Sequence, residues 1–296
     1  MQLHHEDQAA VRDELLRGLL APAAFTAPKY LYDALGSRLF AAITELNEYY
    51  PTRTEAEIFA RHAADIAATL PAGAILVDLG AGNCEKAARL FAHLRPQRYV
   101  AVDISVDFLR QALQHLQREH PLMDLLGVGL DFSSSLVLPP EVGSGPRVLF
   151  FAGSSIGNFT PDEALVFLRQ ASQASQGGAL LIGVDLVKPV TLLEPAYDDA
   201  LGVTAAFNRN MLLHINRLLG SDFDIARWQH RARFDVGLSR IEMHLDALQD
   251  QRVQWPGGQR WFRRGESIHT ENSYKYQAPE FEALLRSAGF EGVRRW

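Results

Sequence analysis

From residue 75 onward, short apolar runs alternate with longer segments that have helical spacing. The apolar runs are Ile75–Leu79, Tyr99–Ile104, Leu126–Leu130, Val148–Phe151 and Leu180–Val184. The intervening helical segments are Glu85–Leu94, Val106–Leu116 and Pro161–Ala174. Short apolar strands that alternate with helices are typical of a parallel sheet with helices on both faces. The pattern therefore predicts an α/β fold with a doubly wound, Rossmann-like sheet.

The residues before this sheet predict a helical extension. Val11–Leu20 and Ser37–Leu46 have apolar positions at helical spacing, and Asn47–Arg53 (NEYYPTR) reads as an aromatic loop. Thr54 and Glu57 have the three-residue separation of a capping box, in which each side chain accepts a backbone N–H of the other's residue. We therefore expect a third helix to begin at Thr54.

The alternation ends after Lys188. Ala200–Leu219 has a long helical pattern, and it is followed by Arg231–Asp235 and Arg240–Asp246, in which apolar and polar residues alternate. Such alternation predicts strands with two different faces, and the two segments suggest an antiparallel pair. We interpret residues 188–277 as an inserted α+β cap that binds substrate. Residues 1–187 and 278–296 are assigned to the domain that carries the parallel sheet.

The last residues are expected to return to that sheet. Pro279–Ser287 has helical spacing, and Gly289–Trp296 is expected to begin another strand. The sequence ends where a final hairpin of the sheet would follow.

Composition narrows the functional class. Of 296 residues, 47% are hydrophobic and 22% charged, which is ordinary for a globular protein, and the net charge of -6 argues against nucleic-acid binding. The single cysteine, Cys84, excludes an internal disulfide and favours a cytoplasmic location. No apolar run approaches the ~20 residues of a membrane span. The ten histidines include His4 and His5 near the start, but no paired His/Cys spacing occurs, so no metal site is predicted.

The stretch ILVDLGAGNCEK, Ile75–Lys86, joins a predicted strand to a glycine loop. A dinucleotide-binding loop has a third small residue where this chain has Glu85, and a phosphate-binding P-loop signature is also absent. Asp103 lies at the end of the next predicted strand, where a carboxylate can accept both hydroxyls of a ribose. The loop therefore predicts a nucleoside ligand that carries little or no phosphate.

S-adenosylmethionine (SAM) fits these features. Its methionine carboxylate would lie against N–H groups at a helix N-terminus. The acidic Asp78 and Glu85 would repel a pyrophosphate but tolerate a sulfonium and an ammonium group. Asp131 ends a third strand and could bond the adenine amino group, while Phe132 stacks nearby. Because ligands bind at the carboxyl ends of parallel strands, these three strand ends indicate one site.

Four long segments add a family resemblance. They are PKYLYDALGSRLFAAITELNEYYPTRTEAEIF, FFAGSSIGNFTPDEALVFL, GVDLVKPVTLLEPAYDDALGVTAAFNRNMLLHINRLLGSDFD and GESIHTENSYKY. Together they resemble the histidine-specific Nα-methyltransferases of ergothioneine biosynthesis, and the resemblance runs from about Ala10 to Trp296. That family uses SAM to trimethylate the α-amine of L-histidine to hercynine, with S-adenosylhomocysteine as the other product. The resemblance thus implies a cytoplasmic SAM-dependent enzyme, which we expect to be a monomer.

The resemblance also implies two groups of site residues. The SAM-binding positions are matched by Gly80, Lys86, Asp103, Asp131 and Phe132, and we assign Gly82 and Gly153 to the same site. The histidine-binding positions are matched by Tyr49, Asn158, Tyr197, Glu271 and Ser273, with Met243 lining the imidazole pocket and Tyr32 near the amine.

The chemistry of methyl transfer suits these side chains. An in-line displacement at a sulfonium methyl needs positioning above all, and the attacking amine must be unprotonated although a free α-amine has a pKa near ~8. Tyr32 and Asn158 offer oxygens that can orient the amine lone pair, so they are the predicted catalytic residues. Glu271 can accept an imidazole N–H and Ser273 can serve the other nitrogen. Two residues apart on an extended segment, they would face the same side.

Other interpretations stay open. Taken singly, Met243 could fill a core, and Glu271 and Ser273 could face solvent. An N-methyltransferase of another amino acid, such as a prenylated tryptophan, is the nearest alternative function. A SAM-binding regulator without turnover is a second alternative, and an NAD-linked oxidoreductase, disfavoured by Glu85, is a third.

Overall fold

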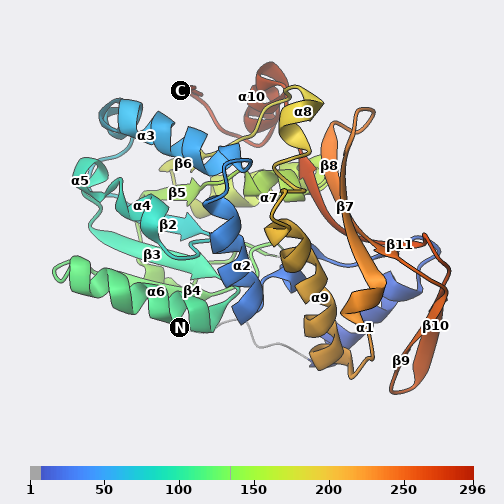
Figure 1. Ribbon diagram of the computed structural model, residues 1–296. Coiled ribbons are helices and arrows are strands. Elements are labelled where there is room, and N and C mark those ends of the chain that lie inside the picture. The colour runs from blue at the N-terminus through green and yellow to red at the C-terminus, as the bar shows by residue number, and fades with distance from the viewer. Residues whose placement is uncertain (1–7, 134) are drawn as a thin grey trace. The chain divides into compact units, whose positions relative to one another are not determined.

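The computed structural model describes residues 8–133 and 135–296, so His4 and His5 lie outside the described residues. Within these, the chain forms two compact units (Figure 1). The first contains residues 51–187 and 275–296, and the second contains residues 8–50 and 188–274. Each unit has a sheet of its own. The role of residues 188–277 as a substrate-binding cap stays a prediction.

The sheet of the first unit is parallel throughout. Its strands are β2 (Ile75–Leu79), β3 (Arg98–Asp103), β4 (Leu125–Gly129), β5 (Arg147–Phe151) and β6 (Ala179–Ile182). Their order is β4-β3-β2-β5-β6, so the chain winds outward from β2 in one direction and then in the other. This reversal places a topological switch point between β2 and β5, where such sheets bind ligands. The predicted doubly wound α/β fold is confirmed.

Helices cover both faces of this sheet. They are α3 (Tyr50–Thr69), α4 (Glu85–Ala88), α5 (Phe91–Leu94), α6 (Val106–Glu119), α7 (Pro161–Ala174) and α10 (Ala278–Ser287). On one face, Leu109 and Leu116 of α6 pack with Leu76 and Tyr99 of the strands. On the other face, the ring of Phe167 in α7 contacts that of Phe151, at a centroid distance of 4.7 Å. The strands are consequently buried on both sides, which explains why they read as continuous apolar runs.

The local sequence explains where α7 begins. Thr160 accepts the backbone N–H of Glu163, and the Glu163 carboxylate accepts the backbone N–H of Thr160, which is a complete capping box. Pro161 occupies the first helical position, where its missing N–H costs nothing. Both bounds of α7 match the sequence-based prediction.

Three local predictions are wrong in the segments that surround or connect the strands of this sheet. The helix expected to begin at Thr54 begins at Tyr50, because Pro51 is accommodated in a first helical turn and moves the start upstream of the supposed capping box. The single helix expected over Glu85–Leu94 is divided into α4 and α5. Residues 289–296 form no strand; Gly289 and Gly292 have positive φ angles of 96° and 63°, which are typical of turns.

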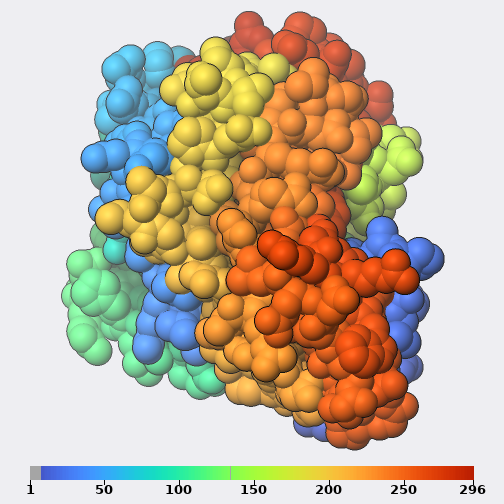
Figure 2. All heavy atoms as spheres, turned by 45° about the vertical axis from the view of Figure 1, so that its right-hand side comes forward, coloured from blue at the N-terminus to red at the C-terminus, as the bar shows by residue number. Residues whose placement is uncertain are grey.

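The second unit is built around a mixed sheet with the order β1-β11-β8-β7. Its strands are β1 (Ala24–Phe25), β7 (Trp228–Asp235), β8 (Arg240–Ala247) and β11 (Ser267–Tyr274), and a separate hairpin consists of β9 (Gln251–Trp255) and β10 (Gly258–Phe262). β1 is parallel to β11, whereas β8 is antiparallel to both β7 and β11. The antiparallel pair predicted from the sequence is therefore present. Figure 2 shows the orange and orange-red atoms of the β7–β10 region gathered on one face of this unit.

The helices of the second unit are α1 (Gln8–Leu20), α2 (Ala34–Thr44), α8 (Val190–Leu193) and α9 (Val203–Leu219). The Asp199 carboxylate accepts the N–H groups of Val203 and Thr204, which caps α9 three residues later than predicted. At the other end Gly220 has a φ of 67°, the left-handed conformation that commonly ends a helix. The apolar side of α9 packs against β8 in a core of buried side chains: Phe207, Met211, Leu212, Ile215, Ile241, Met243 and Leu245.

Four short 3-10 helices complete the secondary structure of the described residues. They are η1 (Pro28–Leu31), η2 (Pro140–Val142), η3 (Ser155–Asn158) and η4 (Ile225–Arg227). None of the described helices is long and apolar enough to cross a membrane.

Candidate active site

The glycine loop joins the carboxyl end of β2 to the start of α4. Gly80, Gly82 and Cys84 have φ angles of 74°, 53° and 65°, so the backbone turns through the left-handed region three times. The loop is tied to β3 by Asp103. Its Oδ2 accepts the N–H of Gly82 at 2.9 Å, and its Oδ1 accepts the N–H of Ser105 at 2.8 Å.

This arrangement determines what Asp103 can offer a ligand. Burial raises the pKa of the Asp103 carboxyl, and the N–H groups of Ser105 and Gly82 oppose that rise. A carboxylate has about four lone-pair positions, so the backbone N–H groups of Gly82, Ile104 and Ser105 leave it some acceptor capacity for a ligand hydroxyl. The carboxylate is therefore held in place by the loop it stabilises, and it keeps the acceptor capacity that a ribose requires.

Asp78 differs from the expectation that it would present a negative charge to the ligand. Its side chain is buried and accepts the Tyr99 hydroxyl at 2.7 Å. Burial raises the pKa of Asp78 to about 7, even though the hydrogen bond from Tyr99 lowers it. Asp78 is thus only partly ionised near neutral pH, and the electrostatic argument made for it from the sequence is weakened.

An aromatic ring lies over the glycine loop. A Cβ atom added to Gly80 would lie 3.6 Å from Cζ of Phe132. The Phe132 ring makes an edge contact with Phe151 at 5.7 Å between centroids. The preceding Asp131 accepts both the N–H and the hydroxyl of Ser133. The loop after β4 therefore presents a carboxylate and an aromatic ring, and that ring lies close to Gly80.

Glu55, on α3, is a residue that the sequence interpretation missed. Its Oε1 accepts the N–H of Gly153 at 2.7 Å, and its Oε2 forms an ion pair with Nζ of Lys86 at 2.8 Å. One carboxylate thus links a helix, the glycine-loop lysine and the turn after β5. A Cβ atom added to Gly183 would lie only 2.5 Å from Glu55 Oε1, so the close approach needs glycine there. The sequence shows that residue 55 is acidic but gives no local signal for its partners, because Lys86 and Gly153 are distant along the chain.

Asn158 also belongs to the first unit. It is the last residue of η3, which follows β5. The turn into η3 passes through Ser154, whose φ is 60° and whose Oγ accepts the N–H of Asp185 at 2.8 Å. The first unit therefore contains all seven residues assigned to SAM together with Asn158.

The other predicted substrate residues belong to the second unit, where three tyrosines form a chain of contacts. The Tyr32 ring contacts Phe40 at 5.6 Å, Phe40 contacts Tyr49 at 6.1 Å, and Tyr49 contacts Tyr197 at 6.2 Å between centroids. The Tyr197 hydroxyl lies 2.7 Å from Oγ of Ser273. Edge-to-face contacts of this kind hold aromatic rings in fixed orientations.

The contact between Tyr197 and Ser273 connects these aromatic side chains to the paired strands β8 and β11. Glu271 pairs directly with Met243, and Ser273 pairs with Ile241. Cross-strand partners have their side chains on the same face of a sheet, so Glu271, Ser273 and Met243 share one face. Both Glu271 and Ser273 are buried. Met243 belongs to the buried core as well, which is the alternative explanation weighed from the sequence.

The family of the chain is decided by comparison of whole sequences. The sequence profile of the SAM-dependent, histidine-specific methyltransferases matches residues 11–296. The chain belongs to this family. Its enzyme class and its cofactor, SAM, are thereby confirmed as predicted.

Three relatives of this chain align with it over most of their length and of its own. The histidine N-alpha-methyltransferases of Mycolicibacterium smegmatis and Mycobacterium tuberculosis are each 40% identical over 294 residues, covering 97% of this chain and 91% of the relative. The 4-dimethylallyltryptophan N-methyltransferase of Aspergillus fumigatus is 25% identical over 311 residues, covering 98% of this chain and 90% of the relative.

The residues of the first unit fit the cofactor of the family. Asp103 retains acceptor capacity for a ribose, Phe132 offers a ring beside Gly80, and Lys86 supplies a cation for a carboxylate. Among residues 8–133 and 135–296, no group of three or more His, Cys, Asp or Glu side chains is arranged to hold a metal ion.

Proposed function

We propose that this methyltransferase trimethylates the α-amino nitrogen of L-histidine, which yields hercynine in ergothioneine biosynthesis. The observation that carries the proposal is the shared face of Glu271 and Ser273 on β11, in a chain that is 40% identical to histidine N-alpha-methyltransferases over most of its length. A carboxylate and a hydroxyl on one face match the two nitrogens of an imidazole ring.

The first unit would hold the cofactor. Bound SAM supplies a methyl group on a sulfonium, which leaves S-adenosylhomocysteine after transfer. Asp103 accepts the ribose hydroxyls, and Asp131 and Phe132 receive the adenine. Lys86, held by Glu55, receives the methionine carboxylate, and Gly80, Gly82 and Gly153 let the backbone approach closely. These contacts would hold bound SAM in one orientation.

The second unit would recognise the amino acid. Glu271 accepts an imidazole N–H, and Ser273, oriented by the Tyr197 hydroxyl, serves the second nitrogen. Tyr49 donates to the substrate carboxylate, the Tyr197 hydroxyl donates to Ser273, and Met243 bounds the space beside the ring. In-line transfer needs an unprotonated amine, so Tyr32 and Asn158 are assigned to orient its lone pair. The amine proton leaves for solvent, either directly or through the Tyr32 hydroxyl, which accepts it while passing its own proton to solvent.

The proposal includes a monomeric, cytoplasmic enzyme that uses no nucleic-acid or membrane partner. Its net charge of -6 and its single, buried Cys84 support this assignment. Sedimentation velocity of the purified protein tests the oligomeric state, since a dimer would sediment as a distinctly faster species.

A second candidate substrate is a tryptophan derivative, which the similarity to the 4-dimethylallyltryptophan enzyme favours. An indole has a single N–H donor, so it would leave the buried Glu271–Ser273 pair less well satisfied than an imidazole would. Mass spectrometry of reactions with SAM separates the candidates. We expect one, two and three added methyl groups on histidine, and little methylation of tryptophan or 4-dimethylallyltryptophan. Binding of SAM with no methylation of any of these amino acids would instead support the non-catalytic regulator.

A further inference from the structure

β11 does not pair regularly with β8. His269 is opposite His244, but the next matched pair is Glu271 with Met243, so Thr270 is an extra residue on β11. Such a β-bulge inserts one residue into one strand, and it changes the side to which the following side chains point.

The position of the bulge determines the face that carries Glu271. In a regular strand His269 and Glu271, two residues apart, would face the same side. Here His269 shares a face with its partner His244, whereas Glu271 shares the opposite face with Met243. Ser273 follows Glu271 to that face, where its Oγ meets the Tyr197 hydroxyl. A register without the bulge would exchange the two faces from Glu271 onward.

We propose that the Thr270 bulge places Glu271 and Ser273 on the face of the sheet that carries Met243, where they can bind the substrate. Thr270 and His269 would then be positioning residues for the recognition of the amino-acid side chain. This inference rests on the proposed function, because it concerns the substrate residues assigned there.

Two side chains hold the bulge. The Thr270 hydroxyl donates to the carbonyl oxygen of Met243 at 3.1 Å, in a buried position. His269 Nε2 lies 3.1 Å from the carbonyl oxygen of Glu271, so it donates across the irregular step. A bulge locally interrupts the ladder of backbone hydrogen bonds, and these side chains supply donors to the two residues that pair just beyond it.

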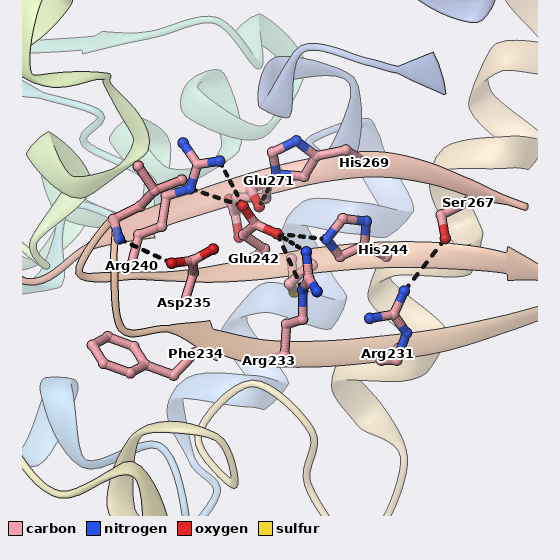
Figure 3. A network of polar contacts seen from close by, with 12 residues as sticks. Arg231, Arg233, Phe234, Asp235, Arg240, Glu242, His244, Ser267, His269 and Glu271 are labelled. Carbon is pink, nitrogen blue, oxygen red and sulfur yellow. Dashed lines mark hydrogen bonds and ion pairs between the residues drawn. The ribbon is translucent and has the colours of Figure 1, made fainter. Parts of the chain in front are cut away.

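The opposite face of the sheet explains why the alternative register is unfavourable. Glu242 forms an ion pair with Arg233 at 2.8 Å and with the guanidinium of Arg240, and its Oε2 lies 3.0 Å from Nε2 of His244 (Figure 3). Burial alone would raise the pKa of Glu242, but the hydrogen bonds from Arg240 and Arg233 lower it to about 2. Glu242 is therefore a fixed negative charge on this face.

Without the extra residue, Glu271 would pair directly with Glu242, whereas the actual partner of Glu242 is Asn272. Two carboxylates in directly opposite positions repel each other, and that repulsion is strong where both are buried. The stacked rings of His244 and His269, 4.8 Å apart, mark the last pair before the faces are exchanged. Charge repulsion between Glu271 and Glu242 and the Thr270 hydrogen bond to Met243 thus favour the same register.

The test uses the full-length enzyme and a pair of substitutions. Thr270→Val keeps the branched shape and removes the hydroxyl, while Thr270→Ser keeps the hydroxyl. We expect Thr270→Val to raise the KM for histidine by about tenfold, the effect of one lost buried hydrogen bond, with SAM affinity unchanged. Thr270→Ser should restore much of the native KM. Thr26→Val is the matched control, because it removes another buried hydroxyl next to β11, one that donates to Met211 Sδ.

Deletion of Thr270 is the stronger perturbation. It should abolish histidine binding in calorimetry while SAM still binds, because the assigned SAM residues belong to the other unit. A deletion variant with native histidine affinity would overturn the inference. So would a Thr270→Val enzyme whose KM matches that of the Thr26→Val control, and this result remains decisive if the deletion variant does not fold. Failure of the native protein to methylate histidine would refute the proposed function instead.

Discussion

The buried Asp78 makes the stability of the first unit depend on pH. The substitution Asp78→Asn keeps a side-chain oxygen that can accept the Tyr99 hydroxyl, and it replaces the ionisable carboxyl with an amide that does not titrate. Because the pKa of Asp78 is raised from 3.8 to about 7, the folded state holds this proton more tightly than the unfolded chain does. The associated stability is fully present below pH ~4, and it is lost as pH rises through 7.

The size of the effect follows from the same two pKa values. A shift from 3.8 to about 7 corresponds to a total loss of roughly 4 kcal/mol at high pH, of which roughly 2–3 kcal/mol falls between pH 5 and 8. The asparagine variant lacks this dependence. We therefore expect the free energy of unfolding of Asp78→Asn to increase, relative to that of the native protein, by roughly 2–3 kcal/mol from pH 5 to pH 8.

Urea denaturation at pH 5, 6, 7 and 8, followed by circular dichroism, measures this difference. Asp107→Asn is a matched control, since Asp107 lies on α6 of the same unit with a side chain that is 85% exposed. The control should show nearly the same pH dependence as the native protein. If the difference between Asp78→Asn and the native protein is constant across these pH values, burial does not raise the pKa of Asp78 and the reasoning is refuted.

Three further predictions concern the site. Glu55→Gln should weaken SAM binding several-fold by releasing Lys86, but calorimetry should show unchanged binding of 5′-methylthioadenosine, which lacks the amino-acid moiety. Equal losses for both ligands would contradict this, and Glu57→Gln, two residues further along the same helix, is the control. Tyr32→Phe should lower kcat by about 10–10³-fold with little change in histidine affinity, and an unaltered kcat in steady-state assays would remove Tyr32 from the mechanism. Glu271→Ala should reduce the ratio of kcat/KM for histidine to that for tryptophan by at least about tenfold, so an unchanged ratio would show that this carboxylate does not recognise the imidazole.

Periodicity in the sequence was enough to predict the parallel sheet. Strands buried on both faces must be apolar throughout, so β2 appears as the uninterrupted run ILVDL, and its bounds match the prediction. The capping box at Thr160 and Glu163 is equally local, because both partners lie within one helical turn. The glycine loop and Asp103 could be related to each other because consecutive parallel strands end at one edge of a sheet.

Features that depend on contacts between distant residues could not be obtained in this way. The pairing of Glu55 with Lys86 and Gly153 joins positions that are far apart in the chain, and no local pattern encodes it. The start of α3 was misplaced because the Thr54–Glu57 spacing satisfies a local rule that the helix overrides.

The contrast is sharpest on β11. From the sequence alone, the two-residue spacing of Glu271 and Ser273 determined that they share a face, because side chains alternate along any extended strand. Which face they share was decided only in the folded sheet, where the Thr270 bulge reverses the alternation relative to β8. Register is a relation between two strands, set by the hydroxyl of Thr270 and the fixed charge of Glu242, and neither strand encodes it by itself.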